Sequence, residues 1–383
     1  MADKKHVIML LSNPFRPDPR VHKEAGALVK GGYDVTVLCW DREQKYSGEE
    51  TVDGIKIKRF GPKSSFEDTK LFLRTLPTFW KLARKEMATM KADFIHAHDL
   101  DTLSPAVKEA RKRKIPVIYD SHEIYHEMAS ERLGSFMVGM VKSYEMRMVR
   151  KPDAVVCVND RFKGIIESWG ARNVTVVMGC PPKPDAPAAV VDSLKKQLSP
   201  DRRQIVVYIG VLEPNRNLTE LADGFSGEKC PNARLVVGGY GTLEKEIAAR
   251  KGQRLSFIGP VKPADLPAYT LAADILVAVY DPAFGNNRDS VPNKLFEAMS
   301  AGKPIIVAKG TWTGQTVERI GCGLTVEYGT DAVFQAIDRL LADKDLYQKC
   351  AANGLKAFDG EYNWPNMEKR LLGLYSGLSV AKD

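Results

Sequence analysis

Residues 289 to 308 read DSVPNKLFEAMSAGKPIIVA, and this stretch predicts a short helix between two buried strands. Residues that start a helix come first and residues that end one come last: Ser290, Pro292, Gly302 and Pro304. Apolar runs suited to strands lie on either side, DILVAVY at 274–280 and KPIIVA at 303–308. The apolar helix residues expected in the core are Leu295, Phe296 and Met299.

Runs like these recur along the whole chain, separated by segments of helical length. In the first half they lie at 6–11, 34–40, 54–60, 92–98, 116–120, 153–159 and 173–178. In the second half they lie at 204–210, 233–239, 254–259, 274–280, 303–308 and 323–328. Runs that are apolar almost throughout indicate parallel strands covered on both faces. The pattern predicts an α/β protein made of two doubly wound, parallel-sheet, Rossmann-like domains.

A proline-rich segment, CPPKPDAP at 180–187, separates the two series of runs. Prolines disfavour both helix and sheet ladder, so this segment is expected to be a stiff linker. The predicted first domain covers 1–180 and the second covers 188–360, and residues 361–383 are expected to form a last helix that packs back on the first domain. Open α/β sheets bind ligands beyond the carboxyl ends of their strands, so we expect the two domains to face each other across a binding cleft.

The composition is that of a globular protein, with 44% apolar and 27% charged residues in 383. The net charge is +8, and residues 1–180 carry most of it, with 31 Lys and Arg against 24 Asp and Glu. The chain shows no nucleic-acid-binding motif, so the basic half is expected to meet an anionic membrane face or a phosphate-bearing acceptor. No apolar run reaches the roughly 20 residues of a membrane span, and we expect a cytoplasmic protein. The six cysteines are widely spaced, which predicts buried free thiols.

Polar residues at the head of the predicted helix point to a nucleotide site. The first turn of a helix exposes unpaired N–H groups that favour a diphosphate, and Lys294 adds a positive charge. Asn293 and Glu297, four residues apart, share a face, and an acidic residue at 297 is placed to accept the hydroxyls of a ribose. The alternative is an ordinary capped surface helix with a Lys294–Glu297 ion pair.

The same stretch resembles the signature of glycosyltransferase family 4, which has the GT-B fold. That signature is E-x7-E followed by A-x-A-x-G-x-P, and this chain has Asp289-x7-Glu297 followed by AMSAGKPII. The resemblance implies that Glu297 holds the donor ribose and that Asp289, in place of the family's first glutamate, lies near the sugar. It extends over nearly the whole chain.

Other donor-binding positions follow from the same resemblance. In the segment YIGVLEPNRNL, Arg216 lies near the position of a family lysine that neutralises the diphosphate, while Val211 replaces the partner arginine. The remaining implied donor-binding residues are Gly210, Gly239 and Pro260.

In the first half, PVIYDSHE matches the family segment whose histidine contacts the transferred sugar, which makes His122 the first catalytic candidate. The run ADFIHAH places His96 and His98 on the same side of a strand, and His98 is a further catalytic candidate. Hydrogen bonding that only fixes a loop is the alternative for both.

The letters HEIYH at 122–126 also match a zinc-peptidase motif, with Glu123 as base and Glu145 as a third ligand. This alternative leaves the second half of the chain without a role. A separate segment, residues 66–91, combines Leu, Phe and Trp with Lys and Arg, which suits a helix on anionic lipid or a core helix with a solvated basic face.

The resemblance therefore implies a retaining hexosyltransferase that uses a UDP-sugar or GDP-sugar, needs no metal or other cofactor, and acts on a glycan or lipid-linked acceptor in glycan, glycolipid or cell-surface polysaccharide synthesis. A GT-B nucleotide-sugar epimerase and a non-catalytic nucleotide-sugar sensor are the alternatives that use the same nucleotide site.

Overall fold

The computed structural model describes residues 4–16, 18–65, 68–130, 133–227, 229–250, 252 and 254–380. The chain divides into two compact units. Unit 1 comprises residues 1–179 together with 365–383, and unit 2 comprises residues 180–364. The two sheets, described separately below, confirm the prediction of two parallel-sheet α/β domains.

Unit 1 is built on an eight-stranded sheet with the order β3-β4-β2-β1-β5-β6-β7-β8. Its strands are β1 (His6–Leu11), β2 (Asp34–Trp40), β3 (Glu49–Val52), β4 (Ile55–Phe60), β5 (Phe94–His98), β6 (Val117–Ser121), β7 (Ala154–Cys157) and β8 (Val174–Val176). All neighbouring pairs are parallel except β3 with β4, which form an antiparallel hairpin at one edge. The hairpin was not predicted, because β3 reads EETV and alternates between exposed and half-buried positions.

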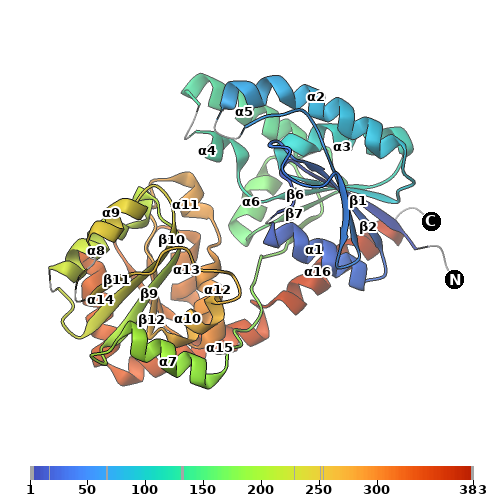
Figure 1. Ribbon diagram of the computed structural model, residues 1–383. Coiled ribbons are helices and arrows are strands. Elements are labelled where there is room, and N and C mark those ends of the chain that lie inside the picture. The colour runs from blue at the N-terminus through green and yellow to red at the C-terminus, as the bar shows by residue number, and fades with distance from the viewer. Residues whose placement is uncertain are drawn as a thin grey trace. The chain divides into compact units, whose positions relative to one another are not determined.

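The helices of unit 1 cover both faces of this sheet. They are α1 (Pro19–Lys30), α2 (Thr69–Ala88), α3 (Leu100–Arg113), α4 (Tyr125–Ala129), α5 (Ser135–Met148) and α6 (Asp160–Ser168), together with most of α16 (Trp364–Val380). Figure 1 shows α2, α3 and α5 over one face, and α1 and α16 over the other. The last helix thus completes a unit that the chain began 360 residues earlier.

Unit 2 has a six-stranded, fully parallel sheet with the order β11-β10-β9-β12-β13-β14. Its strands are β9 (Gln204–Val211), β10 (Ala233–Tyr240), β11 (Leu255–Phe257), β12 (Ile275–Ala278), β13 (Ile305–Ala308) and β14 (Gly323–Val326). The helices are α7 (Ala188–Leu198), η1 (Pro214–Arg216), α8 (Leu218–Ser226), α9 (Glu244–Ala249), α10 (Leu266–Ala272), α11 (Gly285–Asp289), α12 (Asn293–Ala301), α13 (Trp312–Ile320), α14 (Thr330–Ala342) and α15 (Lys344–Gly360).

The helix predicted from 289–308 is α12, and it lies between β12 and β13 as expected. Its core-facing residues Leu295, Phe296 and Met299 are buried, as predicted. Its start differs from the prediction: Pro292 is the N-cap, and Ser290 is the C-cap of the preceding helix α11. The short helix α11 was not predicted, since GNNRD has little helical preference of its own.

All six cysteines are buried and free, as predicted. Among the helices within the described ranges, not one is long and apolar enough to cross a bilayer.

Candidate functional site

In unit 2, the carboxyl ends of the neighbouring strands β9 and β12 and the first turn of α12 bring a lysine and two tyrosines together. Lys294, the second residue of α12, is only 8% exposed despite its charge. Its Nζ lies 4.3 Å from the ring centroid of Tyr208, on β9, and 3.5 Å from the hydroxyl of Tyr280, just after β12. The ammonium group is therefore held against aromatic rings, where a cation–π interaction offsets part of its loss of water.

Arg216 adds a second positive charge to the same group of side chains. It ends η1, the turn that follows β9, and its Cζ lies 3.9 Å from the ring centroid of Tyr280. Burial disfavours ionisation of Tyr280, but the charges of Lys294 and Arg216 outweigh this effect and lower the pKa of its hydroxyl. Two cations gathered at a strand-end loop and a helix start can bind a phosphate-bearing ligand.

The loops that carry these residues are tied to each other by Asn215. Its carbonyl accepts hydrogen bonds from the backbone N–H of Asp281, at 3.0 Å, and from the side chain of Asn287, at 3.3 Å. These bonds join the loop after β9 to the segment between β12 and α12. Arg216 is therefore positioned by the same segment that leads into Lys294.

Two glycines leave room beside the cations. Gly210 and Gly239 are register partners on β9 and β10. A Cβ on Gly210 would lie 2.4 Å from Lys294 Nζ, and one on Gly239 would lie 1.8 Å from the Gly210 carbonyl oxygen. Gly239 also has φ +134°, which favours glycine, and its N–H donates to the Gly259 carbonyl at 2.8 Å. The next residue, Pro260, is exposed on the loop after β11.

The remaining predicted residues of unit 2 lie in or beside α12. Asn293, its first residue, is exposed, and Glu297, one turn later, is half-buried. Asp289 ends α11 and is 1% exposed, with its Oδ2 accepting from Arg288 Nη2 at 3.0 Å. An aspartate in an ion pair with its neighbour, rather than an open carboxylate, occupies the first acidic position of the motif.

In unit 1, the carboxyl ends of β5 and β6 form a network around Asp120. This fully buried carboxylate accepts two hydrogen bonds from Arg20 of α1, at 2.6 and 3.0 Å, and Arg20 also donates to the Val177 carbonyl. Its Oδ2 lies 2.7 Å from His122 Nε2 and 3.2 Å from His98 Nδ1. Burial alone would raise the pKa of Asp120, but the charges of Arg20 and His122 hold it well below the usual aspartate range.

His122 lies just past the end of β6 with part of its side chain, 19%, exposed. Its Nδ1 is 3.5 Å from Asp99 Oδ2, so each ring nitrogen faces a carboxylate. Burial disfavours the charged ring, but Asp99 and Asp120 outweigh it and raise the pKa of His122 to about 10. Burial in turn raises the pKa of Asp99 to about 7. Asp99 also has φ +64°, and strained backbone at a non-glycine residue is common at functional sites.

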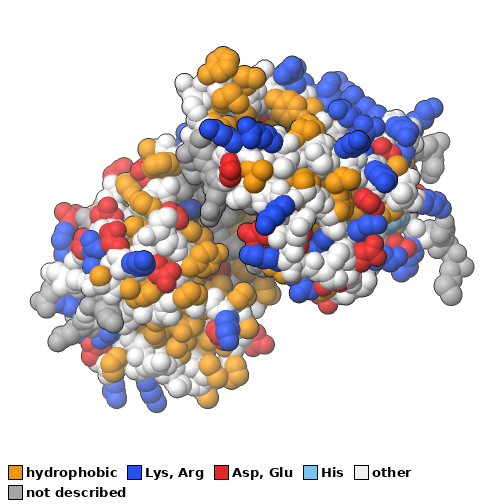
Figure 2. All heavy atoms as spheres, turned by 45° about the horizontal axis from the view of Figure 1, so that its top comes forward, with side chains coloured by type: hydrophobic (Ala, Val, Ile, Leu, Met, Phe, Trp, Pro, Cys, Tyr) orange, Lys and Arg blue, Asp and Glu red, His pale blue; other side chains and the backbone are white. Residues whose placement is uncertain are grey.

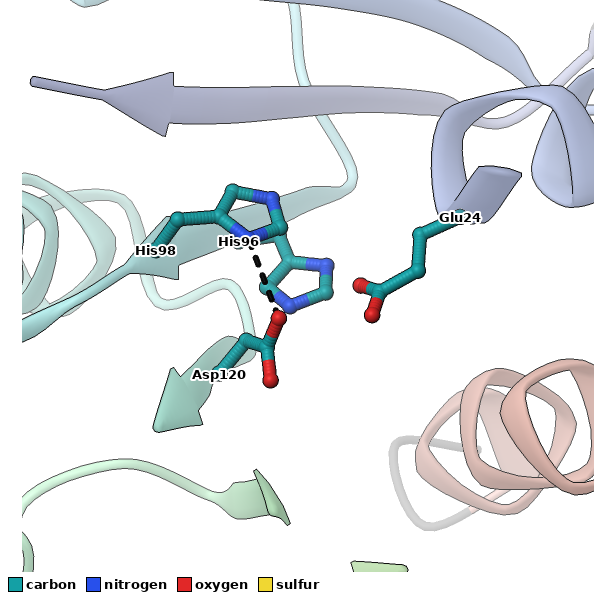
Figure 3. Close-up of side chains that lie close together, drawn as sticks. All are labelled: Glu24, His96, His98 and Asp120. Atoms are coloured by element: carbon teal, nitrogen blue, oxygen red, sulfur yellow. Dashed lines mark hydrogen bonds and ion pairs between the residues drawn. The ribbon is translucent and has the colours of Figure 1, made fainter. Parts of the chain in front are cut away.

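Below this exposed histidine lie three fully buried groups, His96 and His98 of β5 and Glu24 of α1. Figure 3 shows the Glu24 carboxylate pointing toward the two imidazoles, with Asp120 beside His98. The rings of His96 and His98 stack with centroids 4.5 Å apart, and Tyr375 of α16 hydrogen-bonds His96 Nδ1 at 2.9 Å. His96 is thus part of the interior, whereas His98 touches both Asp120 and His122.

The motif HEIYH does not form a peptidase site. Helix α4 begins at Tyr125, so His122 lies outside it and the two histidines are not successive turns of one helix. His126 Nδ1 pairs instead with Glu145 Oε2 at 2.7 Å, and Glu145 also accepts from the backbone N–H groups of Tyr125 and His126. Glu145 therefore caps the first turn of α4. The zinc-peptidase interpretation is wrong, because His122 and His126 do not lie on one helix.

Sequence reasoning did not identify several residues of these two groups: Glu24, Asp99, Asp120, Tyr208 and Tyr280. Tyr208 and Tyr280 lie near the ends of apolar runs, where a tyrosine usually packs in the hydrophobic core. Spacing could have identified Tyr208, because this residue precedes Gly210 by two positions and so faces the same side of β9.

Two family models match consecutive parts of the chain. The model described as Glycosyltransferase Family 4 matches residues 20–179, and the model described as Glycosyl transferases group 1 matches residues 191–357. The first match lies within unit 1 and the second within unit 2.

Similar proteins agree with these matches. YtcC of Bacillus subtilis is 23% identical over 211 residues, covering 51% of each chain. Sucrose-phosphate synthase of Spinacia oleracea is 28% identical over 196 residues, covering 45% of this chain and 18% of the plant enzyme. These alignments thus span about half, or less, of the curated relatives. Among solved structures, sucrose-phosphate synthase of Thermosynechococcus elongatus superposes with TM-score 0.80 at 18% identity, covering 98% of this chain and 100% of that one. Anabaena HepE, solved with UDP-glucose, gives 0.72 at 16% identity, covering 97% and 99%.

Proposed function

Because the chain belongs to the family 4-like glycosyltransferases of the GT-B fold, we propose that it transfers a sugar from a UDP-sugar or GDP-sugar to an acceptor hydroxyl. The observation that carries this proposal is the pair of cations, Lys294 and Arg216, held on Tyr208 and Tyr280 at the strand ends of unit 2. This positive charge lies beside Gly210 and Gly239, which have no side chains. Such a site suits a diphosphate better than a neutral ligand.

In this proposal the donor lies along the start of α12. Lys294, Arg216 and the free N–H groups of the first turn bind the diphosphate, and Asn293 and Glu297 face the nucleoside, with Glu297 accepting the ribose hydroxyls. Gly210, Gly239 and Pro260 line the approach. The HepE structure, which holds UDP-glucose, supports a sugar nucleotide as the ligand of this fold.

Bond cleavage leaves negative charge on the departing phosphate, and the cations and the helix start are placed to stabilise it without a metal. We propose transfer with retained anomeric configuration, in which the leaving phosphate assists deprotonation of the acceptor. His122, His98 and Asp289 are the proposed catalytic residues, and the charged imidazole of His122 is suited to hold a hydroxyl of the transferred sugar.

The acceptor is proposed to be a glycan or lipid-linked molecule at the cytoplasmic face of an anionic membrane. Helix α2 exposes basic side chains, among them Lys81 and Lys85, and α5 exposes Phe136, at 79%, and Met140, at 53%. Figure 2 shows hydrophobic and basic side chains gathered next to each other on unit 1. Such a mixture suits an interfacial position on lipid. Residues 66 and 67 of the predicted amphipathic segment lie outside the described residues.

A donor screen tests the proposal. UDP-, GDP- and ADP-sugars are each added to the protein, and a ligand that binds only the folded state raises its melting temperature. We expect one UDP- or GDP-sugar to do so, and the variant Lys294→Met to abolish the shift, whereas Lys309→Met, at an exposed lysine paired with Glu327, should keep it. If no sugar nucleotide stabilises the protein, the proposal fails.

Incubation with the bound donor then separates the remaining activities. Product formed only with an acceptor, and with the donor's anomeric configuration by NMR, supports a retaining transferase. Isomerised donor sugar without acceptor would indicate an epimerase, and binding without any turnover would indicate a sensor.

A further inference from the structure

Unit 1 contains a buried group of potential metal ligands underneath His122. Glu24 comes from α1, His96 and His98 from β5, and Asp120 from β6, and one ligand atom of each lies within 4.8 Å of the others. All four side chains are fully buried. Figure 3 shows them converging from three separate elements. The group lies entirely within unit 1 and shares no residue with the donor site of unit 2, and in this inference His98 binds the ion instead of acting on the substrate.

The two histidines are oriented as metal-binding histidines usually are. Histidines that bind metals typically engage the second ring nitrogen with a carboxylate or another polar group, which fixes the tautomer. Here His98 Nδ1 lies 3.2 Å from Asp120, and His96 Nδ1 lies 2.9 Å from the Tyr375 hydroxyl. The Nε2 atoms of both rings are buried and have no hydrogen-bond partner within the described part of the chain.

Glu24 is left unsatisfied in the same place. Among the described residues, both of its carboxylate oxygens are buried without a hydrogen bond, Arg20 Nη2 lies 3.3 Å from Oε1, and the carboxylate of Asp120 lies close by. Arg20 is already committed to Asp120 through two shorter bonds. A buried carboxylate without adequate partners is costly, and a bound cation is one of the ways in which proteins offset that cost.

We propose that His96 Nε2, His98 Nε2 and both oxygens of the Glu24 carboxylate bind one Zn²⁺ ion in a four-coordinate site, with Asp120 as the carboxylate that orients His98. Two imidazoles and a carboxylate form a common zinc ligand set. Three carboxylates, Glu24, Asp99 and Asp120, lie in this network with two cationic groups, the guanidinium of Arg20 and the imidazole of His122. Since the ligands are fully buried, the ion is structural, joining α1 to the central strand β5 and, through Tyr375, to α16.

The test uses the full chain after removal of metals with a chelator. Equilibrium dialysis against Zn²⁺ should give one bound ion per chain and a raised melting temperature. Co²⁺ substituted for Zn²⁺ should give the intense visible bands of a four-coordinate site. The variants Glu24→Gln and His96→Gln should lose both signals. Two matched controls at other buried residues, Glu109→Gln and His126→Gln, should retain them.

Three results would overturn the proposal: less than one Zn²⁺ per chain in the unsubstituted protein, a Co²⁺ spectrum without four-coordinate bands, or loss of binding in His126→Gln alone. The last would place the ion at Glu145 instead. The Co²⁺ spectrum is read on the unsubstituted protein, so it decides the matter even if a variant does not fold. The outcome is independent of sugar-nucleotide binding, which is measured by the donor screen.

Discussion

His122 Nε2 lies 2.7 Å from Asp120 Oδ2, and the two residues are separated by a single position at the end of β6. Strand alternation turns both side chains to the same side, so the carboxylate orients the exposed imidazole from below. Arg20 fixes that carboxylate from the opposite side with two hydrogen bonds. The candidate catalytic histidine therefore depends on a helix that is about 100 residues away in the chain.

Replacing this carboxylate should reduce turnover more than donor binding. In Asp120→Asn the imidazole loses its charged partner and its fixed orientation, and misplacing a catalytic group costs on the order of 100-fold in rate. We expect kcat to fall by roughly that factor while the donor KM stays within about twofold. Asp53→Asn, at an exposed aspartate, is the control and should leave both constants unchanged. An increase in KM at constant kcat would contradict a positioning role.

Alanine substitutions at two neighbouring glycines of unit 2 should have different effects, one on donor binding and the other on stability. A methyl group at Gly210 meets the flexible end of Lys294, so Gly210→Ala should displace the ammonium and raise the donor KM about 10-fold, or ~1.4 kcal/mol, and its φ of +159° should add a smaller loss of melting temperature than in Gly239→Ala. At Gly239 the methyl group meets the backbone of β9, and the left-handed φ adds strain, so Gly239→Ala should lower the melting temperature. Equal loss of stability in both variants would contradict this distinction.

The tyrosine beside both cations should titrate abnormally. Positive charge favours the tyrosinate, so the pKa of Tyr280 lies below its usual value, and removing the nearest charge in Lys294→Met should raise it. The difference in tyrosinate absorbance between each protein and its Tyr280→Phe counterpart, followed against pH, isolates this hydroxyl. Its titration should move to higher pH in Lys294→Met and stay in place in Lys309→Met. An unmoved titration in Lys294→Met would show that the lysine does not act on the tyrosine.

Glu145 should matter for stability and not for metal binding or transfer. Glu145→Ala removes the acceptor of two backbone N–H groups and the partner of His126, which should lower the free energy of unfolding by about 1–3 kcal/mol in urea. Glu167→Ala, which breaks only an exposed ion pair with Lys163, should cost less than about 0.5 kcal/mol. A stable Glu145→Ala protein that has lost its activity would revive a catalytic role for HEIYH.

Most of the fold could be predicted from the sequence, because its strands and helices follow local patterns of apolar residues and of residues that start or end helices. Apolar runs marked the central strands, and the residues around α12 marked a helix whose core face was correct at Leu295, Phe296 and Met299. The hairpin strand β3 was missed because its residues are mostly polar and its pairing depends on β4. The helix α11 was missed because its sequence favours a turn.

The site was readable only where a residue type is unusual for its position. A lysine at a helix start or a histidine after a strand attracts notice, but Asp120 and Tyr280 do not. Their importance arises from contacts made across the fold, such as Arg20 with Asp120 and Arg216 with Tyr280. Such pairings depend on strand order, and a single sequence does not give strand order.

The hydrogen bond from α16 to β5 has a consequence for how the protein is made. Tyr375 contacts His96 in the interior of unit 1, yet a ribosome reaches position 375 only after synthesising all of unit 2. While unit 2 is being synthesised, the sheet of unit 1 therefore lacks the helix α16 on one of its faces. The first unit is thus completed only after the second has been synthesised, although its strands come earlier in the chain.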